Sequence, residues 1–114
     1  MPYIEIKTNV PVDNEKEIIL KSRIADNLAS SFRGKTEKWL MVNISDDQRM
    51  YFGGADDPCA LVSVDLLGKQ QEAGYEQMTA YTCKLISETL GIKMDRVYIK
   101  YMEYEHWGWN GSNF

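Results

Sequence analysis

The chain begins Met1-Pro2-Tyr3-Ile4-Glu5-Ile6-Lys7-Thr8, where a proline is followed by alternating apolar and polar residues. Such alternation is typical of a β-strand that buries one of its faces. We therefore predict a strand over Tyr3–Thr8, with both isoleucines on one face and Glu5 and Lys7 on the other.

The proline in second position has a chemical consequence. Removal of Met1, which is usual before a small second residue, would make Pro2 the chain terminus and turn its amide nitrogen into a secondary amine. Such an amine can accept a proton at neutral pH if its surroundings disfavour the ammonium form. The alternative is a proline present by chance, and the ordinary abundance of proline, about 5%, favours that alternative when this observation stands alone.

Length and composition predict one domain over residues 1–114. The chain is 44% hydrophobic and 26% charged, and no apolar run approaches the length of a membrane span. A net charge of −4 without a Lys/Arg cluster argues against nucleic acid as a partner. No basic and apolar leader is present, so we expect a cytoplasmic protein without a membrane partner, with release from the cell without a signal peptide as the alternative.

The sulfur and imidazole groups are too few for a metal centre. Cys59 and Cys83 are the only thiols, and we expect both to be reduced and buried, with a disulfide as the minor alternative. His106 is the only histidine, and there is no closely spaced Cys or His cluster. A serine-histidine-aspartate site would have to use this histidine, but no nucleophile motif surrounds any serine. The sequence thus predicts neither a metal nor a cofactor.

A helix is predicted after the first strand. Asn9-Val10-Pro11 ends that strand, and Asn14 has the features of a helix cap, with Glu17 three residues later as in a capping box. An apolar stripe of about five turns then follows at helical spacing, formed by Leu20, Ile24, Leu28 and Phe32, with Ala25 and Ala29 beside them. Gly34 suits the left-handed conformation that follows many helices.

Further strands and a second helix follow. Four stretches are predicted as strands, the second of them short: Glu37–Ile44, Arg49–Phe52, Ala60–Leu66 and Arg96–Met102. The second helix precedes the last of them and shares one face among Met78, Thr82, Leu85 and Thr89, with Tyr81 and Ile86 nearby. Gly91 ends this helix, and the tail carries Trp107-Gly108-Trp109-Asn110.

The two halves of the chain repeat one pattern. A shift by half of the 114 residues takes Gly34 onto Gly91 and Ile4 onto Leu61. It also superposes apolar positions of two predicted strands, Leu40, Val42 and Ile44 onto Val97, Ile99 and Tyr101. Each half is thus a strand, a helix and a strand. Two β-α-β units predict an α+β fold with a four-stranded sheet and both helices on one face.

The other face of that sheet is predicted to contact another subunit. It would carry Trp39 and Met41 from one strand and Tyr98 and Met102 from another. Because apolar surfaces of this kind are usually interaction sites, we expect a homo-oligomer.

Several short motifs occur along the chain in a characteristic order. They are Pro2 before a strand, Thr8-Asn9-Val10-Pro11, Gly34-Lys35, Phe52-Gly53-Gly54, Pro58-Cys59-Ala60, Gly68-Lys69, Asp95-Arg96-Val97-Tyr98-Ile99, and Gly108-Trp109-Asn110-Gly111-Ser112 with Phe114. Each motif alone is weak, but the ordered set covers nearly the whole chain. In this order the motifs resemble those of the macrophage migration inhibitory factor family of the tautomerase superfamily.

The resemblance implies a homotrimer whose three sheets wrap into a barrel, with active sites between subunits. It also implies keto-enol tautomerisation of small aromatic 2-keto acids such as phenylpyruvate, and of dopachrome analogues. The implied site consists of Pro2 as the catalytic base and a substrate-binding set of Lys35, Leu67, Tyr98, Lys100, Trp109 and Phe114. The alternative function is cytokine-like signalling through a cell-surface receptor, with the pocket vestigial or part of the binding surface.

Elementary chemistry supports the implied base and its neighbours. Pro2 takes a proton from the carbon beside a carbonyl, so its amine must be neutral at the start. An apolar pocket and a nearby cation both lower the pKa of an amine, and Lys35 would be that cation. Lys35 can also bind the substrate carboxylate, with the backbone N–H of Leu67 as a second donor.

The aromatic residues of the implied site would form a wall for the substrate ring. Purely structural roles are the alternatives: Tyr98 and Phe114 as core residues, and Trp109 as a packing residue at the trimer edge. Lys35, just after a helix, could likewise serve only to offset the helix dipole.

Two residues depart from the family pattern. Lys100 stands where many relatives have asparagine, which would make the pocket more basic and favour more acidic substrates. Val62 replaces the second cysteine of the Cys-x-x-Cys motif of vertebrate members. Cys59-Ala60-Leu61-Val62 therefore cannot form that dithiol, and thiol-disulfide oxidoreductase activity is not expected.

Overall fold

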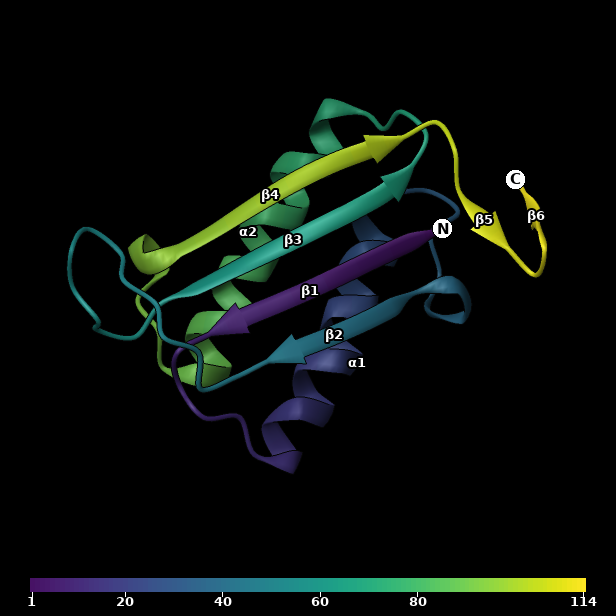
Figure 1. Cartoon of the computed structure of the whole chain (residues 1–114). Helices are drawn as coiled ribbons and strands as arrows, with labels where there is room; N and C mark the ends of the chain where they lie inside the picture. Colours follow the sequence, from purple (N-terminus) through teal and green to yellow (C-terminus); the bar gives the residue numbers. More distant parts are fainter.

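The centre of the protein is a mixed four-stranded sheet with the order β2-β1-β3-β4, seen in a computed structural model that describes residues 1–114 (Figure 1). β1 (Pro2–Thr8) is parallel to β2 (Met41–Ser45) and antiparallel to β3 (Ala60–Leu67). β4 (Val97–Tyr104) is parallel to β3. The opening stretch of the chain is therefore a central strand, hydrogen-bonded on both sides.

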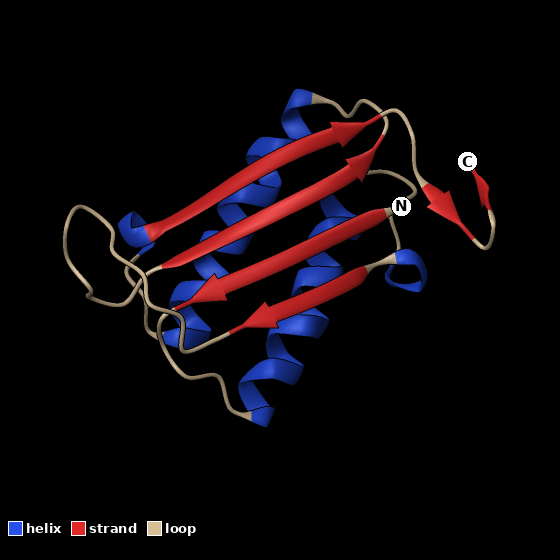
Figure 2. Ribbon diagram, viewed as in Figure 1, coloured by secondary structure: helices blue, strands red, loops and turns tan.

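Both helices cover the same face of the sheet, as Figure 2 shows. They are α1 (Asn14–Ser31) and α2 (Glu72–Leu90). One core forms between the layers, and its largest fully buried residues include Ile4, Ile6, Val62, Val64 and Leu66 from the sheet and Leu20, Ile24, Leu28, Met78 and Ile86 from the helices. The predicted fold class of two β-α-β units is confirmed. Neither helix is both long enough and apolar enough to cross a membrane.

The smaller predictions for the core are mostly confirmed. Cys59 and Cys83 are both buried and unpaired, as expected. Ala25 is buried in the α1 stripe, but Ala29 is exposed and does not belong to it. Burial of the large aliphatic residues supplies most of the driving force for this fold, at about 25 cal/mol for each Å² of apolar surface.

The start of α1 differs from the prediction by one residue. Asp13, in an extended conformation, is the N-cap, and its carboxylate accepts the N–H of Lys16 at 2.9 Å. Asn14 is already helical, so the predicted cap at Asn14 is wrong. Both residue types cap helices well, and the charge of aspartate adds a favourable interaction with the positive end of the helix dipole.

The strand predicted over Glu37–Ile44 begins later than expected. Residues Glu37–Trp39 form a short 3-10 helix, closed by a hydrogen bond of 3.1 Å from the N–H of Leu40 to the carbonyl of Glu37. Trp39 therefore lies outside the sheet, and its predicted place on the open sheet face is wrong. Met41 begins the strand instead.

The short strand predicted over Arg49–Phe52 does not form. Phe52 makes only an isolated bridge with Ala55, because Gly53 and Gly54 turn the chain back between them with φ of 63° and 81°. A short apolar run next to a glycine pair favours a strand by its pattern alone, but here it leads into a tight turn.

The last strand and the tail also differ from the prediction. Arg96 belongs to a short 3-10 helix, Met94–Arg96, and β4 starts after it and extends beyond the predicted end at Met102. The tail forms a hairpin of two short strands, β5 (Gly108–Trp109) and β6 (Ser112–Asn113). The turn between them has positive φ at two successive residues, which is the conformation that an Asn-Gly pair favours.

The internal repeat holds with one local offset. Gly34 and Gly91 both have a left-handed backbone, with φ of 81° and 69°. The shift that superposes them pairs Ile4 with Leu61, but Ile4 faces the helices and Leu61 lies on the opposite face, where it is only partly buried. The neighbour Val62 occupies the helix-facing position. Since side chains alternate along a strand, a one-residue difference in spacing is enough to exchange the faces.

The sheet face away from the helices is apolar at its ends and polar in its middle. Met41, Tyr98 and Met102 are 67%, 63% and 55% exposed, as expected for an uncovered apolar surface. Between them the register aligns a polar row across all four strands, Asn43, Glu5, Ser63 and Lys100. The prediction of an apolar face is therefore correct at the two ends and wrong in the middle. We call this surface the open face.

Candidate active site

The chain terminus lies against the end of β3. Pro2 is buried and is paired with Leu66 in the sheet. The carbonyl of Met1 accepts the N–H of Leu67 at 3.1 Å, which fixes the position of the terminal residue. With Met1 attached, the nitrogen of Pro2 is an amide, and the amine belongs to Met1. Removal of Met1 would place a secondary amine at the buried end of β1 and free the N–H of Leu67.

Lys35 lies beside the terminal amine. Its Nζ donates to the carbonyl of Leu67 at 3.1 Å and is not bound to the last carbonyls of α1, so its side chain does more than offset the helix dipole. Burial first, and then the charge and hydrogen bond of Lys35, lower the pKa of the Met1 amine from 8.0 to about 6. Both causes act on a positive charge at this position, and the amine is therefore largely neutral at pH 7.

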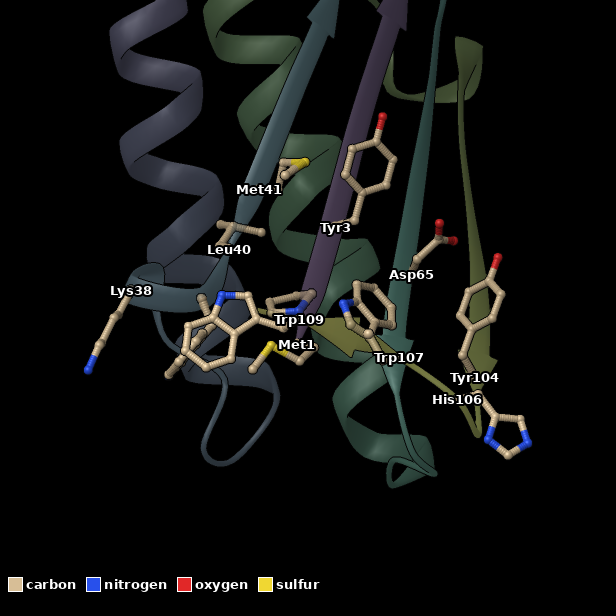
Figure 3. A pocket seen from close by; sticks show the side chains of 13 residues that line it. Met1, Tyr3, Lys38, Leu40, Met41, Asp65, Tyr104, His106, Trp107 and Trp109 are labelled. Carbon is tan, nitrogen blue, oxygen red and sulfur yellow. The ribbon is translucent and has the colours of Figure 1, made fainter. Parts of the chain in front are cut away.

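A cavity of about 660 Å³ opens beside the terminus. Most of the 13 residues that line it are hydrophobic, and the lining includes Tyr3, Asp65, Tyr104, Trp39, Trp107 and Trp109. In Figure 3, Met1 lies among the indole rings, while Lys38 and His106 point away from the centre on opposite sides. A concave apolar site with few polar groups is the usual form of a small-molecule site.

The wall is held together by contacts between aromatic rings. The ring centres of Trp39 and Trp109 are 5.0 Å apart in an edge-to-face arrangement, and Trp109 stacks on Phe114 at 5.9 Å. The N–H of Phe114 donates to the carbonyl of Trp107 at 3.0 Å, which ties the chain end to the hairpin. Trp109 and Phe114 remain 52% and 53% exposed, so they are surface residues and not part of the core.

Of the remaining two predicted site residues, Tyr98 lies at the opposite end of the sheet and Lys100 lies in the middle of the open face. Tyr98 is aligned with Leu61, whereas Pro2 is aligned with Leu66. That offset along β3 corresponds to roughly 17 Å at the usual rise of about 3.3 Å per residue. Lys100, two residues after Tyr98, is also exposed on the open face. A single chain therefore does not bring these two residues to the amine.

The position of Tyr98 is determined by the loop before β3. Its ring lies 4.6 Å from that of Phe52, and Arg96 holds the loop through hydrogen bonds to four carbonyl groups, those of Phe52, Ala55, Asp57 and Pro58, at 2.9 to 3.2 Å. With an exposed fraction of 63%, Tyr98 is not a core residue. A smaller hollow of about 380 Å³ lies beside it.

The structure thus gathers Pro2, Lys35 and Leu67 at one end of the sheet, with Trp109 and Phe114 beside the same cavity. Sequence reasoning missed part of the lining, namely Tyr3, Asp65, Tyr104, Trp39 and Trp107. Tyr3 and Asp65 alternate with buried residues next to Pro2, which would have placed them on the open face once the strand pairing was known. The tryptophans come together only through the 3-10 helix and the tail hairpin, which the sequence pattern did not predict.

This arrangement can perform acid–base chemistry on an organic acid. A largely neutral amine can accept a proton, the neighbouring lysine can bind a carboxylate, and the aromatic wall can hold a ring. A base beside an anion-binding group suits a substrate whose acidic C–H lies close to a carboxylate.

Known proteins match this chain along its whole length. The family model described as "Macrophage migration inhibitory factor (MIF)" matches residues 1–114. The macrophage migration inhibitory factor of Mus musculus is 40% identical over 116 residues, which cover 100% of this chain and 99% of that protein. The crystal structure of a MIF protein from Leishmania major is 30% identical, with a TM-score of 0.93, and covers 100% of this chain and 97% of its own. A homologue from Prochlorococcus marinus is 31% identical, with a TM-score of 0.82 and 98% of each chain covered.

Proposed function

The chain belongs to the macrophage migration inhibitory factor family, and on that premise we propose that it is a keto-enol tautomerase that uses the amine of Pro2 as its general base. The proposed substrates are small aromatic 2-keto acids of the phenylpyruvate type, and dopachrome-like compounds. Met1 is removed in the active protein. The cytoplasm is the proposed site of action.

One observation carries this proposal: the Met1 amine, beside Lys35 at the mouth of the cavity, has a pKa lowered to about 6 by burial and by that lysine, and the amine of Pro2 would be exposed to both influences once Met1 is removed. An amine with this pKa is neutral at physiological pH and yet basic enough to hold a proton between the two steps of a tautomerisation. An ordinary chain terminus, with a pKa of about 7.7–8.0, would be mostly protonated at pH 7.

The proposed mechanism moves one proton at a time. Lys35 and the N–H of Leu67 bind the substrate carboxylate, and the ring lies against the aromatic wall that Trp109 forms with Phe114 behind it. The Pro2 nitrogen removes a proton from the carbon beside the carbonyl, while the carbonyl oxygen gains one from solvent to give the enol. In the reverse direction the protonated amine delivers its proton to carbon, and the enol oxygen returns its proton to solvent. No electron is gained or lost, so the step needs no redox partner.

The proposed assembly is a homotrimer with sites between subunits. In one chain Tyr98 lies too far from Pro2 to act there, Lys100 lies in the middle of the open face, and the apolar ends of that face are uncovered. A neighbouring copy that covers this face would bring its Tyr98 and Lys100 to the cavity of the first chain. Burial of the exposed methionines and tyrosines would favour association.

The decisive experiment is a phenylpyruvate tautomerase assay on protein whose N-terminus has been checked by mass spectrometry. We expect turnover by the form that begins at Pro2, and a trimer in light scattering at micromolar concentration. Processed, trimeric protein that leaves phenylpyruvate at its spontaneous rate of tautomerisation would contradict the proposed activity. A stable monomer would contradict the proposed assembly.

A further inference from the structure

Asp65 is the one carboxylate in the lining of the large cavity, and no partner satisfies it within the chain. Every ion pair of the structure involves other residues, and no side-chain hydrogen bond reaches its oxygens. By contrast, Glu5 on the same face lies 3.8 Å from Lys7 and accepts from Asn43 at 3.2 Å. Figure 3 shows Asp65 standing on the open face between Tyr3 and Tyr104.

Lys100 is the corresponding unpaired cation. It is exposed on the open face and forms no ion pair in the chain. It borders the same small hollow of about 250 Å³ as Asp65, yet it is aligned with Ser63, whereas Asp65 is aligned with Met102. This offset of two positions makes them diagonal neighbours on adjacent strands, about 7–8 Å apart, and the two charges form no ion pair within the chain. One chain therefore leaves one negative and one positive group unmatched on the surface that would be buried in a trimer.

We propose that Lys100 of a neighbouring copy pairs with Asp65 on the side of the cavity that Tyr3 and Tyr104 line. This inference rests on the proposed function, because a neighbour that brings Tyr98 to the cavity also brings Lys100 into it. A lysine that enters an aromatic cavity needs a counter-charge, since burying an unpaired cation is costly. Among the residues that line the cavity, only Asp65 offers one.

The pair also defines the class of substrate. With both charges matched, this side of the cavity is neutral, and Lys35 beside the terminal amine remains the group that binds an anion. The site then takes acids with one carboxylate and an uncharged ring. This differs from the sequence expectation that Lys100 makes the whole pocket basic, because that expectation did not include Asp65.

Reversing the charge of Asp65 or Lys100 tests the proposed ion pair, and the measured quantity is the stability of the trimer, not the enzymatic activity. We expect Asp65→Lys and Lys100→Asp each to weaken the trimer on the order of a hundredfold, because like charges would meet at each interface. Combining both changes in one chain should restore the trimer. Native mass spectrometry over a dilution series measures the distribution of oligomers.

Mixing the two single variants separates pairing between chains from pairing within a chain. In a mixed trimer, opposite charges face each other across every interface between an Asp65→Lys chain and a Lys100→Asp chain. Within every chain the charges remain alike. A trimer has three interfaces, so a mixed trimer carries opposite charges at two of them and like charges at the third. We therefore expect mixed trimers to be more stable than the trimer of either single variant and less stable than the trimer of the double variant. Rescue by the double variant without rescue by mixing would assign the pair to a single chain and overturn the inference.

Two controls keep the test conclusive. Asp26→Lys and Lys93→Asp reverse exposed charges outside the open face and should leave the trimer unchanged. If a reversal unfolds the chain, as circular dichroism would show, the neutral variants Asp65→Asn and Lys100→Gln and their combination give the coupling by a double-mutant cycle. An unchanged trimer in the single variants, or a coupling of zero, would overturn the inference. Phenylpyruvate turnover in the unmodified protein remains a separate test of the proposed function.

Discussion

The two ends of the sheet carry different parts of the candidate site. At the end where β1 begins, backbone pairing fixes the terminus, Lys35 lies beside the amine, and aromatic rings enclose a cavity of about 660 Å³. At the other end, Tyr98 is largely exposed, and its surroundings depend on a loop held by Arg96. The first end thus contains the groups for the proposed proton transfer. The second contains Tyr98, which in the proposed trimer would act at the site of another copy of the chain. Changes at the two ends should therefore have different consequences.

The largest effect is expected at the amine itself. Protein that retains Met1 should be at least about a thousandfold less active than protein that begins at Pro2, the upper range for loss of a general base. With Met1 attached, the Pro2 nitrogen has no available lone pair. The amine then belongs to Met1, one residue before Pro2, and is displaced by about 3.8 Å. The Met1 carbonyl also occupies the N–H of Leu67. Rates of phenylpyruvate tautomerisation by the two forms measure the difference.

The matched control is Pro2→Gly in the processed protein. It leaves a primary amine in the same place, so activity should fall without vanishing while the trimer stays intact. Equal rates for the Met1-bearing and processed forms would exclude Pro2 as the base.

The second effect is expected at Lys35. We predict that Lys35→Gln lowers kcat/KM at pH 6.5 roughly a hundredfold, because the substrate loses a charged contact and the amine becomes more basic. In the unmodified protein kcat/KM should rise with pH through a pKa well below 8.0, since burial and Lys35 both disfavour the ammonium form. Without Lys35 that rise should move toward 8.0. If kcat/KM of Lys35→Gln rises at the same pH as that of the unmodified protein, Lys35 does not act on the amine. Lys38→Gln, beside the cavity but pointing outward, is the control.

The third effect tests the other end of the sheet. Arg96→Lys should destabilise the protein by about 2 kcal/mol, because a lysine cannot reproduce the hydrogen bonds that Arg96 donates to four carbonyl groups. Urea unfolding at fixed protein concentration measures this change. Activity should fall about tenfold through displaced Tyr98, while the pH of half-maximal kcat/KM stays the same. A shifted pH profile would mean that the two ends are not independent.

The sequence predicted the helix-covered half of the molecule better than the open face. Alternation along β1 and the four-residue spacing in α1 follow directly from burial, and the core contains the expected residues, such as Ile4 and Ile24. The predicted start of α1 was one residue too late, because Asp13 and Asn14 are adjacent and both are good N-cap residues. Trp39 lies in a 3-10 turn, where its ring packs against that of Trp109 from the tail, and no local pattern predicts this long-range contact.

The candidate site shows the same limit. The resemblance named Pro2, Lys35 and Trp109, and the structure places all three near one cavity. Asp65 was missed because a single aspartate in an apolar strand has no local signature. Its significance arises only when strand pairing sets it on the open face, where neither Asp65 nor Lys100 forms an ion pair within the chain.

The smallest effect is expected from Lys100→Asn, and its direction distinguishes a paired lysine from an irrelevant one. Removing Lys100 would leave the carboxylate of Asp65 without a counter-charge in the cavity. That carboxylate would repel the second anionic group of a dianionic ligand. It would affect a monoanionic ligand less, because the single carboxylate of such a ligand binds at Lys35. Dianionic ligands such as 4-carboxyphenylpyruvate should therefore lose on the order of 1 kcal/mol of binding free energy, about fivefold in affinity, while phenylpyruvate loses less. Asp65→Asn should have the opposite effect and strengthen binding of the dianion. Tryptophan fluorescence titration of the processed trimer measures both ligands, since Trp109 lies in the wall of the cavity. Equal changes for the two ligands would mean that Lys100 points away from the cavity.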